Sequence, residues 1–239
     1  FKIYAVNNDS SEPETFEVLD HLKAKYPNHF TCIDSPGEFN YAKINNQAVS
    51  KVKEDYILLL NNDILIDSNF AITTLLQTHI FYNAVITGSK LLYPSGKIQH
   101  NGLACTQEKH IAIHSPFRGQ QTKLHHEMLS DRDIHPWDRT HECSAVTAAC
   151  LLMNKQDFLD IGGFDEDFKV AYNDVDLCFR AREKYFSRPI ICTTDLKIYH
   201  LESESRGMDT DTEKAARLYH ERIKLVNRHE YLFSKPDPF

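Results

Sequence analysis

The sequence predicts one α/β domain, and two observations support this fold class. Short apolar runs of strand length alternate with helical patterns over the first half of the chain, and strands and helices mix without a repeat in the second half. The 239 residues are also enough to bury a substantial core. We therefore expect a sheet that packs against helices within a single domain.

The first half of the chain gives a regular series of elements. Apolar runs bounded by polar residues predict strands at residues 1–6, 30–33, 56–60 and 84–88. Apolar residues at helical spacing predict helices that begin near residues 11, 44 and 70. A capping box from Ser11 to Glu14, with Pro13 inside it, starts the first helix. The expected apolar face of that helix comprises Phe16, Leu19, Leu22 and Tyr26.

A hairpin and a long insert follow. Pro94-Ser95-Gly96 separates two short apolar runs and predicts a tight turn. Residues 104–142 lose their periodicity and are rich in His, Gln, Arg and Asp. Long polar inserts of this kind in compact domains are often functional, so we expect a lid or a binding loop here.

The remaining elements complete the sheet and its helices. Strands are expected at residues 145–153, 190–193 and 196–199. Helices are expected at residues 155–161, where Gly162-Gly163 ends the helix, from a capping Asn173 to about Lys184, and from about residue 212. The last helix is expected to bury Ala215, Leu218, Tyr219, Ile223 and Val226.

Composition narrows the class of function. The net charge is -7 and no stripe of Lys and Arg is present, which argues against sequence-independent nucleic-acid binding. No apolar run is long enough to span a membrane. The six cysteines are scattered without a C-x-x-C pair, which favours reduced core thiols in a cytoplasmic protein over a zinc site or a disulfide scaffold.

The most informative polar cluster is Asn61-Asn62-Asp63, which directly follows the predicted strand at residues 56–60. A carboxylate at the C-terminal end of a buried strand lies on the rim where open α/β sheets bind ligands. Its hard oxygen atoms suit a divalent cation that carries phosphates. The alternative is a simple turn between two strands, because Asn and Asp favour turns, and this segment alone does not decide between them.

A second cluster, Asn173-Asp174-Val175-Asp176, lies at the start of a predicted helix. The helix dipole there favours an ionised Asp174, which can accept a proton from an attacking hydroxyl group. The alternative is that Asn173 and Asp174 only cap the helix, and their spacing by itself favours capping.

Three further groups have a functional and a structural interpretation. His200 follows a strand and can bind a metal beside Asp63, although a histidine at a strand end is more often structural. Arg206 can clamp a diphosphate, or it can pair with Glu202 or Glu204 on the surface. Residues 99–102 either face the site or only form a turn, and the pattern favours the turn.

These clusters, in this order, resemble the family 2 glycosyltransferases with a GT-A fold, and most closely the bacterial rhamnosyltransferase and O-antigen branch. Any one motif is weak, but the ordered set is specific and spans nearly the whole chain. The motifs are residues 39–46, 58–63, 90–94, 98–102, 145–150, 162–166, 173–178 and 200–207. The resemblance implies a GT-A, Rossmann-like mixed sheet flanked by helices.

The resemblance also implies roles for single residues. Asn61 and Asp63 occupy the D-x-D positions that hold a divalent metal, Mn or Mg, and the donor diphosphate, with Asn62 between them. His200 matches a histidine that completes the metal shell, and Arg206 falls where a diphosphate contact is useful.

Two other motifs complete the implied site. Asp174 matches the general base, and Asp176 supports the start of its helix and the acceptor site. The residues expected at the nucleotide base and ribose are Asn7, Asn8 and Asp9.

The implied activity is inverting, metal-dependent transfer from a UDP- or dTDP-linked sugar to a saccharide or lipid-linked glycan in polysaccharide synthesis, in the cytoplasm or at the inner face of the membrane. Residues 1–103 would form the donor half and residues 104–239 the acceptor and catalytic half, where the polar insert would select the acceptor. A nucleotidyltransferase is a rival enzyme, and a nucleotide- or glycan-binding module without turnover is a rival of another class.

The chain departs from the family pattern in three places. Asn7 stands where the family usually has Asp, and Ala148 replaces a usual Gly in the acceptor region. The chain also begins at what resembles the second strand of the family, so we expect a fragment of a longer polypeptide that lacks the usual first strand. The edges on either side of that gap would invite pairing with another chain, including a second copy in a homodimer.

Overall fold

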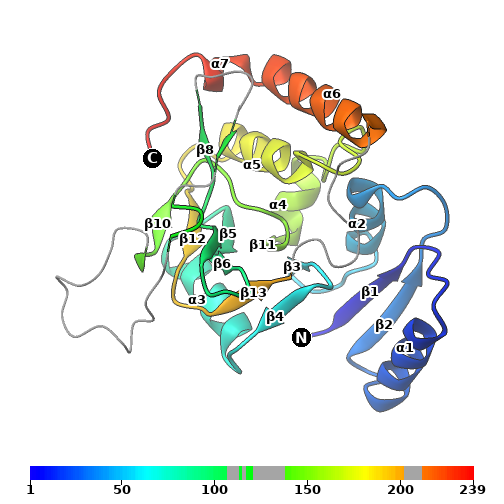
Figure 1. The fold of residues 1–239 in the computed structure, drawn as a ribbon. Helices are drawn as coiled ribbons and strands as arrows, with labels where there is room; N and C mark the ends of the chain where they lie inside the picture. The colour runs from blue at the N-terminus through cyan, green and yellow to red at the C-terminus, as the bar shows by residue number, and fades with distance from the viewer. Residues whose placement is uncertain (107–112, 115–116, 121–137, 202–211) are drawn as a thin grey trace.

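The computed structural model describes residues 1–106, 113–114, 117–120, 138–201 and 212–239 (Figure 1). Its helices are α1 (Pro13–Lys25), α2 (Tyr41–Val49), α3 (Ala71–Phe81), α4 (Lys155–Asp160), α5 (Asn173–Lys184), α6 (Thr212–Arg228) and α7 (Glu230–Phe233). Helices and strands alternate along the first half of the chain, as the sequence predicts. The polar insert falls mostly outside the described residues.

A five-stranded mixed sheet forms the centre of the domain. Its strands, in spatial order, are β10 (His141–Glu142), β12 (Ile190–Thr193), β5 (Ile86–Ser89), β11 (Cys150–Asn154) and β3 (Tyr56–Leu60). Strand β12 runs parallel to β5, whereas β11 is antiparallel to both of its neighbours. This confirms the predicted mixed sheet.

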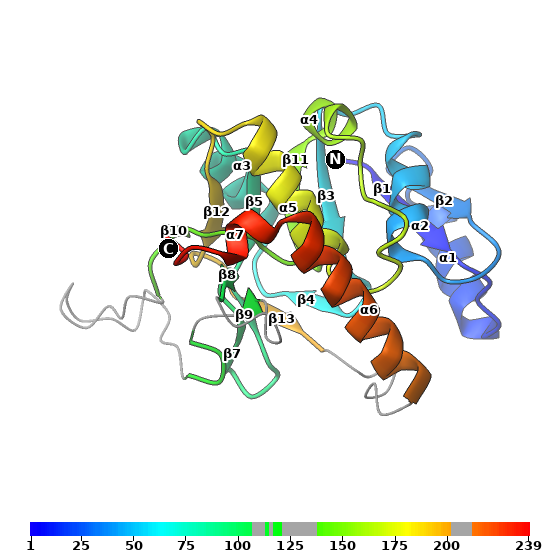
Figure 2. The ribbon, with the colours of Figure 1, turned by 90° about the horizontal axis from the view of Figure 1, so that it is seen from above.

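Both faces of the central sheet are buried. Side chains alternate along a strand, so Leu151 and Met153 of β11 join one apolar cluster while Cys150 and Leu152 join another. The first cluster includes residues of α2, α4, α5, α6 and α7, and the second includes residues of α3. The sheet is therefore flanked by helices on both sides, with α6 and α7 lying over α5 (Figures 1 and 2).

A second, four-stranded sheet lies beside the first and carries several candidate site residues. Its order is β4 (Ile64–Ile66), β13 (Ile198–His200), β6 (Leu91–Leu92) and β7 (Ile98–His100). Strands β6 and β7 are the predicted hairpin, and Gly96 takes the left-handed conformation (φ +79°) that its tight turn needs. A short pair, β8 (Ala104–Cys105) and β9 (Ile113–His114), begins the polar insert.

The N-terminal strands form a separate unit. Strands β1 (Ile3–Asn7) and β2 (Phe30–Asp34) pair in parallel and, with α1, lie to one side of the central sheet (Figure 1). The predicted capping box is wrong, because Glu12 is the N-cap and makes no side-chain bond to the helix. No residue of α1 is buried, and Phe16 of the predicted apolar face is 44% exposed.

Three further local predictions are corrected by tertiary packing. The strand predicted at residues 145–153 begins only at Cys150, because a turn precedes it. Tyr172, not Asn173, is the N-cap of α5. Helix α6 buries Val226, as predicted, together with Leu225, whereas Ala215, Leu218 and Tyr219 are exposed, so only part of the predicted face is buried.

The cysteines agree with the prediction from their spacing. All six are free thiols, and five of them are buried. Burial raises the pKa of the Cys150 and Cys192 thiols to about 12, so both stay protonated at neutral pH. Among the described helices, none combines the length and the apolar character needed to cross a membrane.

Candidate active site at the ends of the central strands

Strand pairing brings two loops of the candidate site together. The register of β3 and β11 places Leu60 opposite Cys150, and the Asn61 main-chain N–H donates to the Ala149 oxygen at 3.1 Å. The turn at residues 147–149 therefore lies directly beside the start of the Asn61-Asn62-Asp63 segment. Between β3 and β4, Asn62 is exposed and Asn61 is half-buried.

Asp63 and His200 meet because their strands pair. In the antiparallel pair of β4 and β13, Ile64 lies opposite His200, and the Leu201 N–H donates to the Asp63 main-chain oxygen at 2.9 Å. The His200 Nε2 atom lies 3.2 Å from Asp63 Oδ1. The Asp63 Oδ1 atom is buried and has no hydrogen-bond donor within the described part of the chain.

The donor set at this point fits a divalent cation only in part. Carboxylate oxygen and imidazole nitrogen both suit Mn, and Mg and Mn sites often use one or two protein ligands together with substrate phosphates. Among the described residues, no group of three or more His, Cys, Asp or Glu side chains is arranged so that it could hold a metal ion. Asp63 and His200 would therefore share a cation with the oxygen atoms of a bound diphosphate.

Asp174 is held at the turn that precedes β11. Its Oδ2 accepts from the Ala148 N–H at 3.0 Å, and its Oδ1 accepts from the Val175 N–H at 2.8 Å. Burial raises the pKa of Asp174, while the hydrogen bonds from Ala148 and Val175 oppose that shift. A carboxylate with a raised pKa that remains ionised near neutral pH is a better proton acceptor than an ordinary one.

The backbone before Asp174 is strained and held from several sides. Tyr172 takes a left-handed conformation (φ +61°), which is uncommon for a bulky residue and often marks a functional site. The buried Asn173 side chain donates to the Phe168 and Val170 oxygens at 3.3 and 3.2 Å. The Glu221 carboxylate of α6 accepts from the main chain of residues 170–171. These contacts fix where Asp174 lies, which goes beyond simple helix capping.

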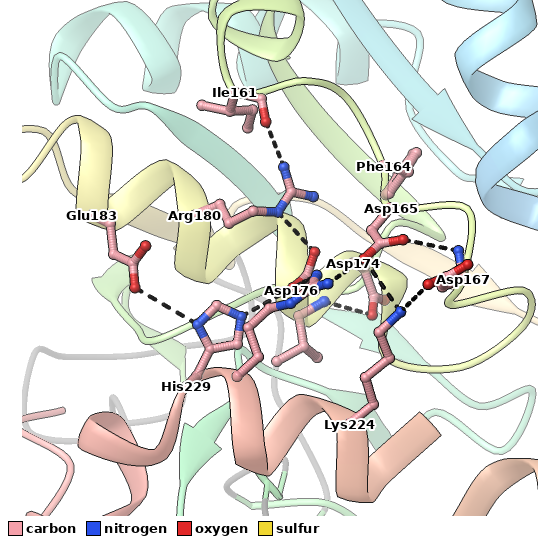
Figure 3. Close-up of polar contacts among 12 residues, drawn as sticks. Ile161, Phe164, Asp165, Asp167, Asp174, Asp176, Arg180, Glu183, Lys224 and His229 are labelled. Atoms are coloured by element: carbon pink, nitrogen blue, oxygen red, sulfur yellow. Dashed lines mark hydrogen bonds and ion pairs between the residues drawn. The ribbon is translucent and has the colours of Figure 1, made fainter. Parts of the chain in front are cut away.

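Asp176 lies on the same helix turn but faces a different environment (Figure 3). It is fully buried, and its carboxylate accepts from Arg180 Nε at 2.8 Å, Arg228 at 2.9 Å and His229 Nε2 at 3.0 Å. Burial alone would raise the pKa of Asp176, but the bond from His229 and the two guanidinium charges lower it to about 2. Asp176 therefore ties α5 to α6 and α7 instead of facing an acceptor.

The loop between β1 and α1 is held by its own polar side chains. The Asn7 amide donates to Asp34 at 3.1 Å, and the Asn8 amide donates to the Ser35 oxygen at 2.6 Å. Asp9 accepts from the Gly37 N–H at 2.7 Å. The three residues expected at the nucleotide thus join the ends of β1 and β2 into one surface.

Residues 99–102 lie closer to the candidate site than their sequence pattern predicts. The sequence favours a plain turn here, but Gln99 and His100 are buried strand residues of β7, and of these four residues only Gly102 takes a left-handed turn conformation (φ +77°). His100 Nε2 accepts from the Thr147 N–H at 3.4 Å, and burial lowers the pKa of His100 to about 3, so it is neutral. The Gln99 side chain contacts His200.

No local sequence pattern predicts the buried ion pair at the base of the insert. Lys90, directly after β5, lies 2.6 Å from Asp138, and both side chains are at most 5% exposed. The pair anchors the end of the insert against the central sheet. Arg206, the predicted diphosphate contact, lies outside the described residues.

Comparisons with curated proteins bear on this site. The family model for glycosyl transferase family 2 matches residues 1–135. The O-antigen biosynthesis protein RfbC of Myxococcus xanthus is 30% identical over 210 residues, which are 87% of this chain and 16% of that protein. The uncharacterized protein y4gI of Sinorhizobium fredii is 27% identical over 227 residues, which are 92% of this chain and 23% of that protein. The chain thus spans less than a quarter of either relative.

Solved structures share the fold at low sequence identity. The structure of GalNAc-T7 with UDP, GalNAc and Mn²⁺ has a TM-score of 0.68 at 9% identity, over 95% of this chain and 41% of that one. A mannosyltransferase of Pyrobaculum calidifontis, in complex with GDP-Man and Mn²⁺, has a TM-score of 0.60 at 11% identity, over 95% of this chain and 55% of that one. The mixed sheet flanked by helices is therefore a GT-A fold. Because the family model covers more than half of its residues, the chain belongs to glycosyl transferase family 2.

Proposed function

We propose that this chain is the catalytic domain of a metal-dependent, inverting glycosyltransferase that moves a sugar from a nucleoside-diphosphate donor to a saccharide acceptor. The observation that carries this proposal is the pair of Asp63 and His200, whose facing atoms lie 3.2 Å apart at the start of β4 and the end of β13. The backbone bonds from Asn61 to Ala149 and from Ala148 to Asp174 connect this pair to a carboxylate suited to proton transfer.

Asp63 and His200 would hold Mn or Mg, with Asn61 next to them in the D-x-D position. The bound cation would neutralise the negative charge that develops on the diphosphate leaving group. Arg206 would add a bidentate contact to the same diphosphate. The surface formed by Asn7, Asn8 and Asp9 would receive the base and ribose, and Asn62 would contact the donor from the opposite loop.

Asp174 would act as the general base. The acceptor hydroxyl oxygen attacks the anomeric carbon from the face opposite the diphosphate, the bond from that carbon to the diphosphate oxygen breaks, and the hydroxyl proton passes to Asp174. The main-chain bonds from Ala148 and Val175 aim the carboxylate. Single displacement of this kind inverts the anomeric configuration.

The biological role that we propose is surface polysaccharide synthesis, and the similarity to RfbC supports it. The acceptor would be a saccharide or a lipid-linked glycan, met in the cytoplasm or at the inner membrane face, where free thiols are the norm. Residues 1–103 would supply most donor contacts and residues 104–239 the base and acceptor contacts. A homodimer would pair the edges of β1 and β3, which have no second partner strand within the described sheets.

Calorimetry with UDP, dTDP and GDP, each with and without Mn²⁺, tests the donor site. GDP is included because one structural neighbour binds GDP-Man. We expect binding that requires Mn²⁺ and that an Asp63→Ala variant loses. Binding that does not depend on the metal or on Asp63 would contradict the proposed site.

Asp174→Asn tests the proposed base and separates an enzyme from a binding module. We expect transfer to fall by about 10²- to 10⁴-fold while donor binding is retained. In the wild type, activity should fall as the pH drops through the raised pKa of Asp174, because protonation removes the base. If no transfer is found although donors bind, the rival interpretation as a non-catalytic module gains support.

A further inference from the structure

Gln99 is a buried side chain on β7 that faces His200 of β13. It is 6% exposed, and its amide makes two contacts with the same residue. The Gln99 Nε2 atom lies 3.4 Å from the His200 main-chain oxygen, and Gln99 Oε1 lies 2.9 Å from His200 Nδ1. The two contacts together fix the direction of the hydrogen bond to the imidazole ring.

The direction follows from which atoms can donate. A main-chain carbonyl oxygen only accepts, so the amide nitrogen of Gln99 must be the atom that faces the His200 oxygen. The reverse placement would bring two oxygen atoms together with no hydrogen between them. The Gln99 oxygen therefore faces Nδ1, and since this oxygen also only accepts, Nδ1 must carry the hydrogen.

The opposite side of the ring is then left with a lone pair. A neutral imidazole has one N–H, so a hydrogen on Nδ1 makes Nε2 an acceptor. The atom that Nε2 faces, at 3.2 Å, is Asp63 Oδ1, which is another acceptor and is buried without a donor in the described structure. Two acceptors at this distance repel unless a cation lies near both.

We propose that Gln99 is a positioning residue that holds His200 as the Nδ1–H tautomer and so presents Nε2 to a divalent cation shared with Asp63. This inference rests on the metal site of the proposed function. Gln99 itself would contact neither the metal nor the sugar. Hydrogen-bond partners of ligating histidines typically contribute 10- to 100-fold to metal affinity, by fixing the tautomer and the orientation of the ring.

The tautomer of His200 can be measured directly by ¹⁵N NMR of the imidazole on the metal-free, wild-type chain at about pH 8, where an ordinary histidine is neutral. A His200→Gln variant assigns the signal. We expect the hydrogen on Nδ1. A hydrogen on Nε2, or on both nitrogens, would overturn the proposal, because Nε2 would then donate to Asp63 and Gln99 would not hold it ready as a metal ligand. This measurement needs no substitution at Gln99 and no enzymatic activity.

Substitution then tests the link to the metal, with Mn²⁺ binding followed by electron paramagnetic resonance in the presence of UDP. Gln99→Leu removes the acceptor for Nδ1–H and should weaken Mn²⁺ binding by about 10- to 100-fold. Gln99→Glu keeps an acceptor at the same place and should retain the Nδ1–H tautomer and most of the affinity. The matched control is Gln156→Leu, whose amide bonds Asp160 on α4, and it should change neither readout.

The outcomes separate this inference from the proposed function. If Mn²⁺ binds tightly but the tautomer is reversed, or if Gln99→Leu binds Mn²⁺ as the wild type does, the role of Gln99 is wrong and the metal site stands. If His200 is the Nδ1–H tautomer but neither Mn²⁺ nor Mg²⁺ binds with any of the three nucleotides, the metal site is wrong, and this role for Gln99 is wrong with it.

Discussion

Two aspartate–histidine pairs in this chain have nearly the same distance between their facing atoms, but they differ in the hydrogen-bond partners around the carboxylate. Asp63 Oδ1 lies 3.2 Å from His200 Nε2, and Asp176 Oδ1 lies 3.0 Å from His229 Nε2. Each pair joins segments that are far apart in the sequence. The distances alone therefore do not distinguish a binding site from a structural contact.

The groups around Asp176 satisfy it completely. Arg180 donates to its carboxylate (Figure 3). Arg228 also donates to it, and the Arg228 guanidinium contacts Asp165 at 2.5 Å as well. Buried carboxylates in folded proteins are normally paired in this way. The cluster around Asp176 is thus a structural link between α5 and the C-terminal helices.

The described surroundings of Asp63 leave one of its carboxylate oxygen atoms without a hydrogen-bond donor. Its Oδ1 atom is buried, and the described residues offer it only the imidazole nitrogen of His200. Buried polar atoms that remain unsatisfied in a protein are rare and often belong to a site that a ligand completes. The comparison teaches that the missing partners, not the presence of an Asp–His pair, identify the candidate metal site.

The largest expected effect is on stability and follows from substitution of Asp176. Asp176→Asn would leave two guanidinium groups beside a neutral, buried amide, and it should lower the free energy of unfolding by about 3–5 kcal/mol. Urea denaturation of the variant measures this change. A loss below about 1 kcal/mol would show that the cluster is not the structural link inferred here.

The same substitution at the other pair should give the opposite pattern. Asp63→Asn should weaken Mn²⁺ binding by at least about 100-fold, since the loss of a ligand exceeds the loss of a partner that only orients one. Its free energy of unfolding should stay within about 1 kcal/mol of the wild type, because no described donor depends on that carboxylate oxygen. Electron paramagnetic resonance and urea denaturation give the two readouts. Destabilisation as large as that of Asp176→Asn would erase the distinction between the pairs.

The pH dependence of stability sharpens the comparison further. The pKa of Asp176 is lowered to about 2 in the folded chain, so its contribution is fully present above the ordinary aspartate pKa and is lost as the pH falls from about 4 to 2. The loss should be about 2 kcal/mol. The difference in free energy of unfolding between the wild type and Asp176→Asn should shrink by this amount over the acid range. A constant difference would contradict the assignment.

The smallest expected effect lies at the edge of the Asp176 cluster. Lys224 bridges Asp165 and Asp167 at 3.5 and 2.6 Å, and the Asp167 side chain is 79% exposed. Exposed ion pairs contribute little, so Asp167→Asn should change the free energy of unfolding by less than about 1 kcal/mol. This variant is also the matched control for Asp176→Asn, and a loss as large as that of Asp176→Asn would mean that the stabilisation is spread over the outer charges.

Local patterns determined the elements and the candidate residues. The apolar run at residues 56–60 predicts β3, and the polar residues after it place Asp63 at a strand end, because burial and turn preference act over a few neighbours. Pro94-Ser95-Gly96 predicts its hairpin for the same reason. The ordered motifs also predict the glycosyltransferase family of the chain, and the match to the family model confirms this prediction.

Only the tertiary structure decided which of these residues meet. Asp63 reaches His200 through the register of β4 and β13, and Gln99 reaches His200 from the β6–β7 hairpin. Helix α6 exposes Leu218 and buries Glu221, because its partners are the charged groups and main chain near α5. A sequence pattern reports local conformation and polarity, whereas pairing between distant segments depends on register and packing that no local window contains.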